Sequence, residues 1–343
     1  MYNSIRKIFS GIFSGDIAID LGTANTIIWV KGEGVVLNEP SVVARNVLDN
    51  NIIAVGNEAN QMVGRTHQGI ETVRPLKDGV IADYKMTDAM IQGFMRKIHR
   101  SRISRPRIVI CIPSGTSSVE QRSIREAAEH ANASEVFLVE EPMAAAIGIG
   151  IDVSLPIGNM IVDIGGGTTE IAVISLNGIG ALETIKIAGD EQTQSIISWF
   201  KTNHKLGVGE RTAEEIKCNV GSATRSKGKQ IFVKGQDLIT GIPKTIEISS
   251  DEIRQALAET VFQITTAIKK ALDKTPPEHA ADIIDYGIIL TGGGALLKNI
   301  DLHIRNKTDL PVHVAEDPLF SVVKGTGLVL EDINKYKKVL INP

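Results

Sequence analysis

At residues 160–174 the chain reads MIVDIGGGTTEIAVI, and residues 17–30 repeat the pattern as IAIDLGTANTIIWV. In both stretches a short apolar run leads into a glycine turn that carries an aspartate and a threonine, and a second apolar run follows. Short apolar runs on both sides of a glycine turn predict a β-hairpin. Two copies of one hairpin indicate a chain made of two duplicated halves.

The two glycine turns carry groups that bind phosphate. Glycine has no Cβ atom to keep backbone N–H groups away from phosphate oxygens, and threonine hydroxyls add further donors. A single turn of this kind is usually only a turn, but two facing copies predict a cleft that holds a nucleotide by its phosphates. The candidate phosphate-binding residues are Gly22, Thr23, Gly165, Gly166, Gly167, Thr168 and Thr169.

Asp20 and Asp163 occupy matching positions, each at the end of the first strand of its hairpin. Carboxylates placed there can hold a hydrated Mg²⁺ against the phosphates. An aspartate that merely forms the turn is the simpler alternative for each residue. As a pair, they favour nucleotide hydrolysis or transfer.

A third glycine turn, TGGGALL at residues 291–297, follows the apolar run at residues 288–290. We expect a helix to begin at Ala295, so this turn suits the adenosine side of the nucleotide. Its presence beside the two hairpin turns strengthens the nucleotide-binding interpretation.

Three charged residues are candidates for catalysis or for contacts with the nucleotide. Glu141 begins an alanine-rich helix, where its carboxylate could orient or deprotonate an attacking water or could simply complement the helix dipole. Glu214 and Lys217 lie one helical turn apart, so they could reach the ribose and purine or form a plain surface ion pair.

Composition sets limits on the other classes of function. With 343 residues the chain exceeds the roughly 250 to 300 at which single cores stop growing, so two domains or more are expected. A net charge of −3 gives no general case for nucleic acid. Cys111 and Cys218 show no metal-ligand spacing and are interpreted as packing residues in a reducing compartment. The chain contains no P-loop, dinucleotide-binding or zinc-protease motif.

Two segments could contact a membrane. The first residues place apolar side chains at helical spacing with basic ones on other sides, which predicts an amphipathic helix that either docks on the protein or lies on an anionic lipid surface. Residues 96–107 include six Lys or Arg and no acidic residue. They form either the solvated end of a helix or a second membrane-facing patch. No apolar run reaches the length of a membrane span.

Strands and helices alternate through both halves. Thr87 is a candidate N-cap for one helix, and Ser118 with Gln121 forms a candidate capping box for another. A small inserted subdomain is expected at residues 41–74, and a polar insertion is expected at about residues 223–250, after helices near 190–204 and 212–220. A long helix is expected from about residue 251 to 272, before the pair Pro276 and Pro277.

Five motifs, taken in order, resemble the actin-like ATPase superfamily over nearly the whole chain. They are DLGT at 20–23, VEEPMAAAIG at 139–148, DIGGGTTE at 163–170, AEEIK at 213–217 and TGGGALL at 291–297. Within the superfamily, DLGTANT at 20–26, LNEPSVVA at 37–44 and RPLKDGVIADY at 74–84 are similar to the bacterial cell-shape family MreB.

The resemblance implies an α/β fold of two duplicated ribonuclease-H-like domains, each with a smaller inserted subdomain, around a nucleotide cleft. We expect an N-terminal membrane-binding helix at residues 1–15 and domain I at 16–150, with its insertion at about 41–74. Domain II would span 151–325, with its insertion at about 191–250, and residues 326–343 would form a C-terminal helix that returns to domain I.

The resemblance also implies ATP or ADP and Mg²⁺ as ligands and slow ATP hydrolysis. Glu141 would position the water, Thr168 would couple the γ-phosphate to the second domain, and Asp20 and Asp163 would hold the metal through water. By motif, the phosphates would be bound by Gly22, Thr23, Ala24, Asn25 and Gly165 to Thr168; the ribose and base by Glu214, Glu215, Ile216 and Lys217; and the adenosine by Gly292, Gly293, Gly294, Ala295 and Leu296.

The expected partners are other copies of the chain in paired protofilaments, an anionic membrane surface and membrane proteins of the cell-elongation machinery, and no nucleic acid is expected. The chain would be cytoplasmic, on the inner face of the membrane, where it would guide lateral cell-wall synthesis. A small-molecule kinase of the same superfamily is the alternative. A chaperone ATPase is disfavoured because little chain follows the last glycine turn.

Overall fold

The chain is described by a computed structural model over residues 15–98, 105–225 and 229–341, and it divides into two units. Unit 1 comprises Met1–Val153 and Phe320–Pro343, and unit 2 comprises Ser154–Leu319. The predicted membrane-binding helix lies outside the described residues, apart from Gly15.

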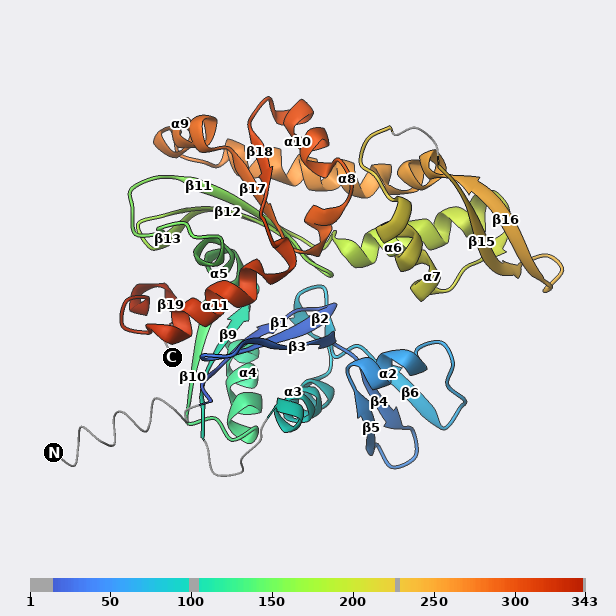
Figure 1. The fold of residues 1–343 in the computed structure, drawn as a ribbon, viewed down its shortest axis with the longest axis horizontal. Helices are drawn as coiled ribbons and strands as arrows, with labels where there is room; N and C mark the ends of the chain where they lie inside the picture. Colours follow the sequence, from blue (N-terminus) through green and yellow to red (C-terminus); the bar gives the residue numbers. More distant parts are fainter. Residues whose placement is uncertain (1–14, 99–104, 226–228, 342–343) are drawn as a thin grey trace. The chain divides into compact units, whose positions relative to one another are not determined.

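A six-stranded sheet forms the centre of unit 1, in the order β19-β10-β9-β1-β2-β3 (Figure 1). The predicted first hairpin is confirmed, since β1 and β2 pair antiparallel around the glycine turn. Strands β9 and β10 then add in parallel to β1. The strand bounds are β1 Ile17–Leu21, β2 Asn25–Val30, β3 Gly34–Pro40, β9 Arg107–Ile112, β10 Glu135–Glu140 and β19 Leu340–Ile341.

A five-stranded sheet forms the centre of unit 2, in the order β13-β12-β11-β17-β18. The second hairpin, β11 and β12, is antiparallel, and β17 and β18 add in parallel to β11. The strand bounds are β11 Asn159–Ile164, β12 Thr169–Ser175, β13 Gly178–Ile185, β17 Ile288–Thr291 and β18 Val312–Val314.

The two sheets share one topology. In unit 1 the order β10-β9-β1-β2-β3 matches β18-β17-β11-β12-β13 in unit 2 strand by strand, with the same parallel and antiparallel pairings. The duplication that the two glycine hairpins predict is therefore present in the fold. Only β19, which pairs antiparallel with β10, has no counterpart.

Alternation along the strands gives the two faces of the unit 1 sheet different roles. Ile17 and Ile19 point into the core shared with α3 and α4, so Ala18 and Asp20 point to the other face. Helices α5 and α11 cover that second face (Figure 1). The helix bounds are α3 Tyr84–Ile98, α4 Ser118–His130, α5 Glu141–Gly148 and α11 Ser321–Glu331, followed by a 3₁₀ turn at Lys337–Val339.

Helices α5 and α11 approach each other closely at two glycines. A Cβ atom on Gly325 would lie 1.7 Å from the Ala144 carbonyl oxygen, and one on Gly148 would lie 1.9 Å from the Ser321 carbonyl oxygen. The two backbones therefore pack without side chains between them at these positions. The expected domain boundary after residue 325 falls inside α11, a continuous helix that belongs to unit 1.

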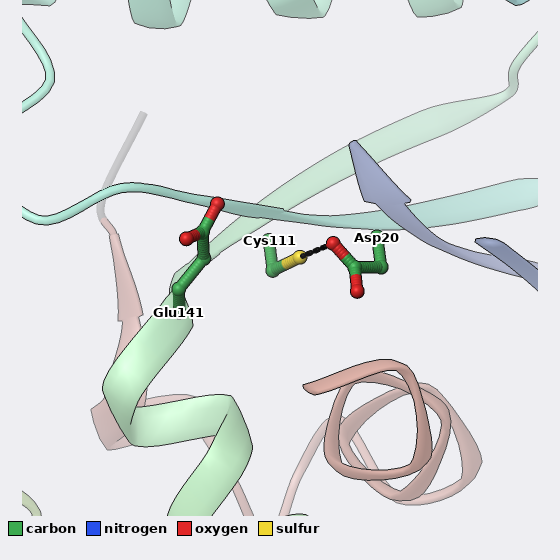
Figure 2. A group of neighbouring side chains, drawn as sticks. All are labelled: Asp20, Cys111 and Glu141. Carbon is green, nitrogen blue, oxygen red and sulfur yellow. Dashed lines mark hydrogen bonds between the residues drawn. The ribbon is translucent and has the colours of Figure 1, made fainter. Parts of the chain in front are cut away.

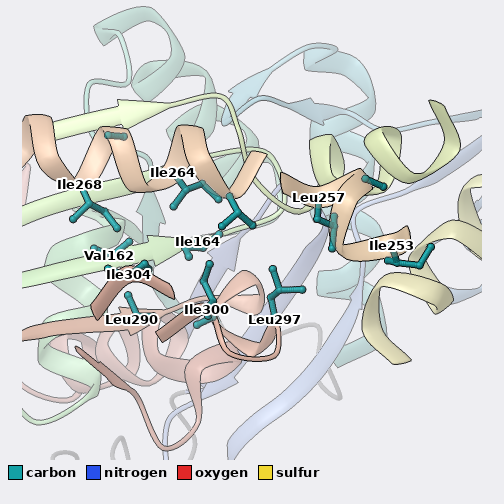
Figure 3. Close-up of a cluster of buried hydrophobic side chains, with 14 of the residues drawn as sticks. Val162, Ile164, Ile253, Leu257, Ile264, Ile268, Leu290, Leu297, Ile300 and Ile304 are labelled. Atoms are coloured by element: carbon teal, nitrogen blue, oxygen red, sulfur yellow. The ribbon is translucent and has the colours of Figure 1, made fainter. Parts of the chain in front are cut away.

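The long helix α8 supplies much of the unit 2 core. Its apolar residues recur at helical spacing, and Ile253, Leu257, Ile264 and Ile268 belong to the same buried cluster as the strand residues Val162 and Leu290 (Figure 3). The predicted helix before the proline pair is thereby confirmed. The helix bounds are α6 Gly189–Trp199, a π-helical turn Phe200–His204, α7 Glu210–Val220, α8 Ser250–Asp273, α9 Pro277–Tyr286, α10 Ile300–Thr308 and a 3₁₀ turn Pro318–Phe320.

Smaller sheets complete the described part of each unit. In unit 1 the strands pair in the order β5-β4-β6 beside the short helix α2, and β7 pairs with β8; in unit 2 the order is β14-β15-β16. The bounds are β4 Val43–Asn46, β5 Ile52–Val55, α2 Asn57–Met62, β6 Ile70–Val73, β7 Leu76–Lys77, β8 Val80–Ile81, β14 Leu206–Gly207, β15 Gln230–Asp237 and β16 Pro243–Ser249.

Both predicted helix caps were wrong, the first by about one helical turn and the second by one residue. Helix α3 begins at Tyr84, where an Asp83 carboxylate oxygen accepts from the Met86 N–H, and Thr87 is buried inside the helix with its hydroxyl donating to the Asp83 carbonyl oxygen. The capping box of α4 is formed by Ser117 and Glu120, one residue before the predicted pair.

The basic segment at residues 96–107 is described only at its two ends. Lys97 donates to the Glu39 carboxylate at 2.7 Å, and Arg107 donates to the buried Asp16 carboxylate at 2.6 Å. These two cations therefore bind the body of unit 1, while residues 99–104 lie outside the described residues. Among the helices that are described, none combines the length and the apolar character that crossing a membrane requires.

Candidate functional site

The first glycine turn, in unit 1, is held by a residue that the motif analysis did not single out. The Ser41 hydroxyl donates to the Gly22 carbonyl oxygen at 2.6 Å, and the Ser41 N–H donates to the Ala24 carbonyl oxygen at 2.9 Å. A Cβ atom on Gly22 would lie 2.6 Å from the Asn25 carbonyl oxygen, so only glycine fits the turn. Ser41 belongs to the LNEPSVVA motif, and its side chain is buried, so this part of the motif holds the first turn in place.

Three potential ligands meet at the carboxyl ends of β1, β9 and β10. Asp20 pairs in register with Cys111 on the neighbouring parallel strand, and Glu141 follows directly after β10 as the first residue of α5. One ligand atom from each side chain lies within 4.8 Å of those of the other two (Figure 2). The structure thus brings the predicted residues Asp20 and Glu141 together, and adds Cys111.

Cys111 was predicted to be a packing residue, and its environment is more specific than that. It is fully buried, and its Sγ lies 3.5 Å from an Asp20 carboxylate oxygen. Burial, and the negative charges of Asp20 and Glu141, raise the pKa of the Cys111 thiol well above its ordinary value. The thiol is therefore protonated and acts as a weak donor to Asp20. Strand register is the signal that could have placed it there.

Asp163 occupies the equivalent strand end in unit 2 and is bonded by the third glycine turn. Its pair in register on β17 is Thr291, whose hydroxyl donates to the Asp163 carboxylate at 3.1 Å. Burial raises the pKa of Asp163 to about 6, against the lowering effect of that hydrogen bond. Gly292 packs directly on this carboxylate, because a Cβ atom there would lie 2.4 Å from it. The start of the third turn therefore contacts the Asp163 carboxylate directly.

The helix expected to begin at Ala295 is instead a 3₁₀ turn, Gly293–Leu296, and α10 begins only at Ile300. A Cβ atom on Gly294 would lie 2.2 Å from an Ile164 side-chain carbon, so the turn must pack closely against β11. Ala295 is buried beneath it, whereas the Leu296 side chain is 54% exposed. Of this turn's residues, Leu296 offers an accessible apolar surface to a ligand.

The second glycine turn docks on the first residues of α6. Gly165 and Gly166 offer their carbonyl oxygens to the N–H groups of Gly189 and Asp190, at 3.1 and 2.8 Å. The Thr169 hydroxyl donates to the Ile187 carbonyl oxygen at 2.7 Å, so its one proton is engaged and Thr169 is withdrawn as a phosphate donor. The turn is thus fixed by contacts within unit 2.

Lys217 is not part of a plain surface pair, because its side chain is only 12% exposed. Its ammonium donates to the Gly189 carbonyl oxygen at 2.8 Å, to the Thr193 hydroxyl at 3.0 Å and to the Glu214 carboxylate at 2.7 Å, which uses its three N–H donors. Burial raises the pKa of Glu214, but the Lys217 charge and hydrogen bonds from Lys217, Thr193 and Cys218 lower it overall.

The other two residues of the AEEIK motif point elsewhere. Glu215 forms an exposed ion pair with Arg211 on the same helix, at 3.1 Å, and Ile216 is buried in the unit 2 core. Glu214 is therefore the residue of this motif that remains suited to contact a ligand. Lys217 orients Glu214 and ties α7 to the start of α6.

The donor sets of both units fit the groups that the sequence predicted. Asp20 and Asp163 offer the carboxylate oxygens that Mg²⁺ prefers. Gly22 and Gly292 stand where a Cβ atom would collide with backbone or with a carboxylate, which is how backbone N–H groups come close to phosphate. Each unit by itself therefore offers groups suited to phosphate and to a metal ion, and unit 1 also presents the Glu141 carboxylate, which can bind a water molecule.

A family model described as MreB/Mbl protein matches residues 14–338. The chain belongs to the MreB/Mbl family. The cell shape-determining protein Mbl of Bacillus cereus is 50% identical over 329 residues, which cover 95% of this chain and 99% of that protein. The cell shape-determining protein MreB of Escherichia coli is 49% identical over 337 residues, which cover 96% of this chain and 97% of that protein.

The crystal structure of MreB 5 of Spiroplasma citri bound to AMPPNP is similar to this chain throughout. The TM-score is 0.88 at 38% identity, with 94% of this chain and 97% of that chain covered. This MreB/Mbl chain therefore has the actin-like ATPase fold that its motifs predicted, as the two duplicated sheets also indicate.

Proposed function

We propose that this chain is an ATP-dependent, membrane-associated filament protein that determines rod cell shape by organising lateral cell-wall synthesis. Membership of a family of cell shape-determining proteins supports the cytoskeletal role, and the AMPPNP-bound relative supports nucleotide binding. The observation that carries the proposal is the meeting of Asp20 and Glu141 beside the first glycine turn.

In this proposal the two hairpin turns bind phosphates, through Gly22 to Asn25 in unit 1 and Gly165 to Thr168 in unit 2. Asp20 and Asp163 would hold Mg²⁺, through water, and the ion would supply positive charge to neutralise the phosphate oxygens. The Glu141 carboxylate accepts a hydrogen bond from the attacking water and so orients it. Glu214 contacts the ribose and base, and residues 292–296 contact the adenosine.

Slow hydrolysis suits a filament that uses it as a timer. Thr168, which is buried at the end of the second turn, is proposed to report the state of the γ-phosphate to unit 2. The proposed partners are further copies of the chain in paired protofilaments, the anionic inner face of the cell membrane, and membrane proteins of the elongation machinery. Residues 41–74 and 191–250 are proposed to form the inserted subdomains.

A single substitution tests the catalytic assignment. Glu141→Ala is expected to leave ATP affinity unchanged and to slow phosphate release at least ~100-fold, the range that loss of a general base or water-positioning group produces. Glu135→Ala, at the exposed opposite end of β10, is the matched control and should behave as the unsubstituted chain does. Unchanged phosphate release by Glu141→Ala would remove Glu141 from the mechanism.

A further inference from the structure

The proposed function leaves Cys111 without a chemical role, although its sulfur lies beside both carboxylates. Asp20, Cys111 and Glu141 come from three elements, β1, β9 and α5, and together they offer one thiol and two carboxylates. Figure 2 shows Cys111 between the two acidic residues, with its sulfur directed at Asp20. We propose that these three side chains form a binding site for a thiophilic divalent cation of the Zn²⁺ class.

The spacing of the ligand atoms suits such an ion. Zn²⁺ binds sulfur at about 2.3 Å and carboxylate oxygen at about 2.0 to 2.2 Å in tetrahedral geometry, so bound sulfur and oxygen lie about 3.5 Å apart. The Cys111 Sγ and the Asp20 oxygen are already 3.5 Å apart. A Glu141 carboxylate oxygen lies within 4.8 Å of the other two ligand atoms. Glu141 is partly exposed and has three rotatable side-chain bonds, so rotation can bring this oxygen to the ion.

The rest of the environment supports binding rather than mere packing. Cys111 and Asp20 stand on adjacent hydrogen-bonded strands, so two ligands are fixed in place before the ion arrives. Asp20 and Glu141 are both partly exposed, which gives the ion a route to the buried sulfur and leaves water as the fourth ligand. On binding, the S–H bond breaks, a sulfur–metal bond forms and the proton passes to the buffer, with no change of oxidation state.

This site differs from the Mg²⁺ site of the proposed function by its use of sulfur. Mg²⁺ takes oxygen ligands and keeps several waters, whereas thiolate selects Zn²⁺ and similar ions. Replacement of Cys111 should therefore affect the thiophilic ion alone. Cys218 provides the internal control, because it is exposed and joins no group of three potential ligands among the described residues.

Co²⁺ gives a direct optical reading of thiolate ligation. The purified full-length chain, without nucleotide or Mg²⁺, is titrated with Co²⁺, and the near-ultraviolet band of thiolate-to-cobalt charge transfer is recorded. We expect the band in the unsubstituted chain and in Cys218→Ser, its loss in Cys111→Ser, and its removal by stoichiometric Zn²⁺. Absence of the band from the unsubstituted chain, or its loss in Cys218→Ser but not in Cys111→Ser, would overturn the proposal.

A second variant guards against misfolding of Cys111→Ser, whose side chain is buried. Glu141→Gln changes a partly exposed side chain, and it should keep the band while weakening Co²⁺ binding at least about ten-fold, since loss of even an outer-shell partner costs that much. Circular dichroism confirms that each variant is folded. Unchanged Co²⁺ affinity in folded Glu141→Gln would exclude Glu141 from the site.

Occupation of the site has a consequence for hydrolysis that, unlike binding itself, rests on the proposed function. The ion would engage both Asp20 and Glu141, so ATP turnover in the presence of Mg²⁺ should fall with Zn²⁺ and return with a chelator that binds Zn²⁺ but not Mg²⁺. Because the Co²⁺ titration contains no nucleotide, failure of the proposed function would leave its result unchanged, and the two failures are distinguishable.

Discussion

Asp163 is a buried carboxylic acid whose surroundings destabilise its ionised form. It is 5% exposed, the Thr291 hydroxyl donates to it, and Gly292 packs against it. Its pKa of about 6 means that burial, not the hydrogen bond, dominates its environment. A carboxylate that is held unfavourably by the protein alone is well suited to gain from a cation, as the proposed Mg²⁺ role requires.

The raised pKa predicts how stability depends on pH. Between about pH 4 and pH 6 the folded chain holds the Asp163 proton while the unfolded chain releases it, so this residue's contribution to stability falls as pH rises through that window. Asp163→Asn should therefore raise the free energy of unfolding by up to ~3 kcal/mol at about pH 7.5, and by less at about pH 5.

Urea unfolding in the presence of a chelator measures this difference. Asp285→Asn, at an exposed position of α9, is the matched control and should change little at either pH. A lower stability of Asp163→Asn than of the unsubstituted chain at the higher pH would contradict the account of Asp163.

At the scale of elements, α5 is placed by α11. Glu141 is the first residue of α5, and the position of α5 depends on backbone contact with α11 at Gly148 and Gly325. A helix from the last part of the chain therefore sets the position of the proposed water-orienting carboxylate.

Gly325→Ala tests that dependence. The added Cβ atom would lie 1.7 Å from the Ala144 carbonyl oxygen, which must force the helices apart. We expect a loss of stability of about 1 to 3 kcal/mol or more, with slower phosphate release because Glu141 moves with α5. Leu328→Ala, on the more exposed side of α11, should leave phosphate release unchanged, and equal effects of the two substitutions would contradict this reading.

The elements themselves were largely predictable, and their contacts were not. The two hairpins and α8 follow from apolar periodicity, which is a local property of the sequence. The cap of α4 was misplaced because the adjacent residues Ser117 and Ser118 both satisfy a capping pattern, and only the hydrogen bonds distinguish them. Cys111 was missed because its importance depends on strand register, which joins residues far apart in sequence.

At the scale of the whole molecule, the duplication was the strongest prediction. The motifs cover the chain from one glycine hairpin to the third turn, and the family match and the shared sheet topology agree with them. The role of Ser41 was not predicted, although this residue lies in the LNEPSVVA motif. A serine that holds a turn is recognised only when its hydrogen-bond partners are known. Residues 1–14 lie outside the described residues, so their membrane role stays a prediction.

Deletion of residues 2–14 tests that role. The deleted segment carries the apolar residues at helical spacing, so its loss should reduce co-sedimentation with anionic liposomes while ATP affinity is unchanged. Liposomes of neutral lipid are the control for the electrostatic part of binding. Undiminished binding of the shortened chain to anionic liposomes would count against the anchor.

Electron microscopy of the purified full-length chain on anionic lipid, with Mg²⁺ and ATP, tests whether the chain is a nucleotide-dependent filament protein. We expect paired protofilaments on the lipid when ATP is present and few or none without nucleotide, because assembly is proposed to depend on the bound nucleotide. Single particles in every nucleotide state, on a preparation that binds ATP, would contradict it.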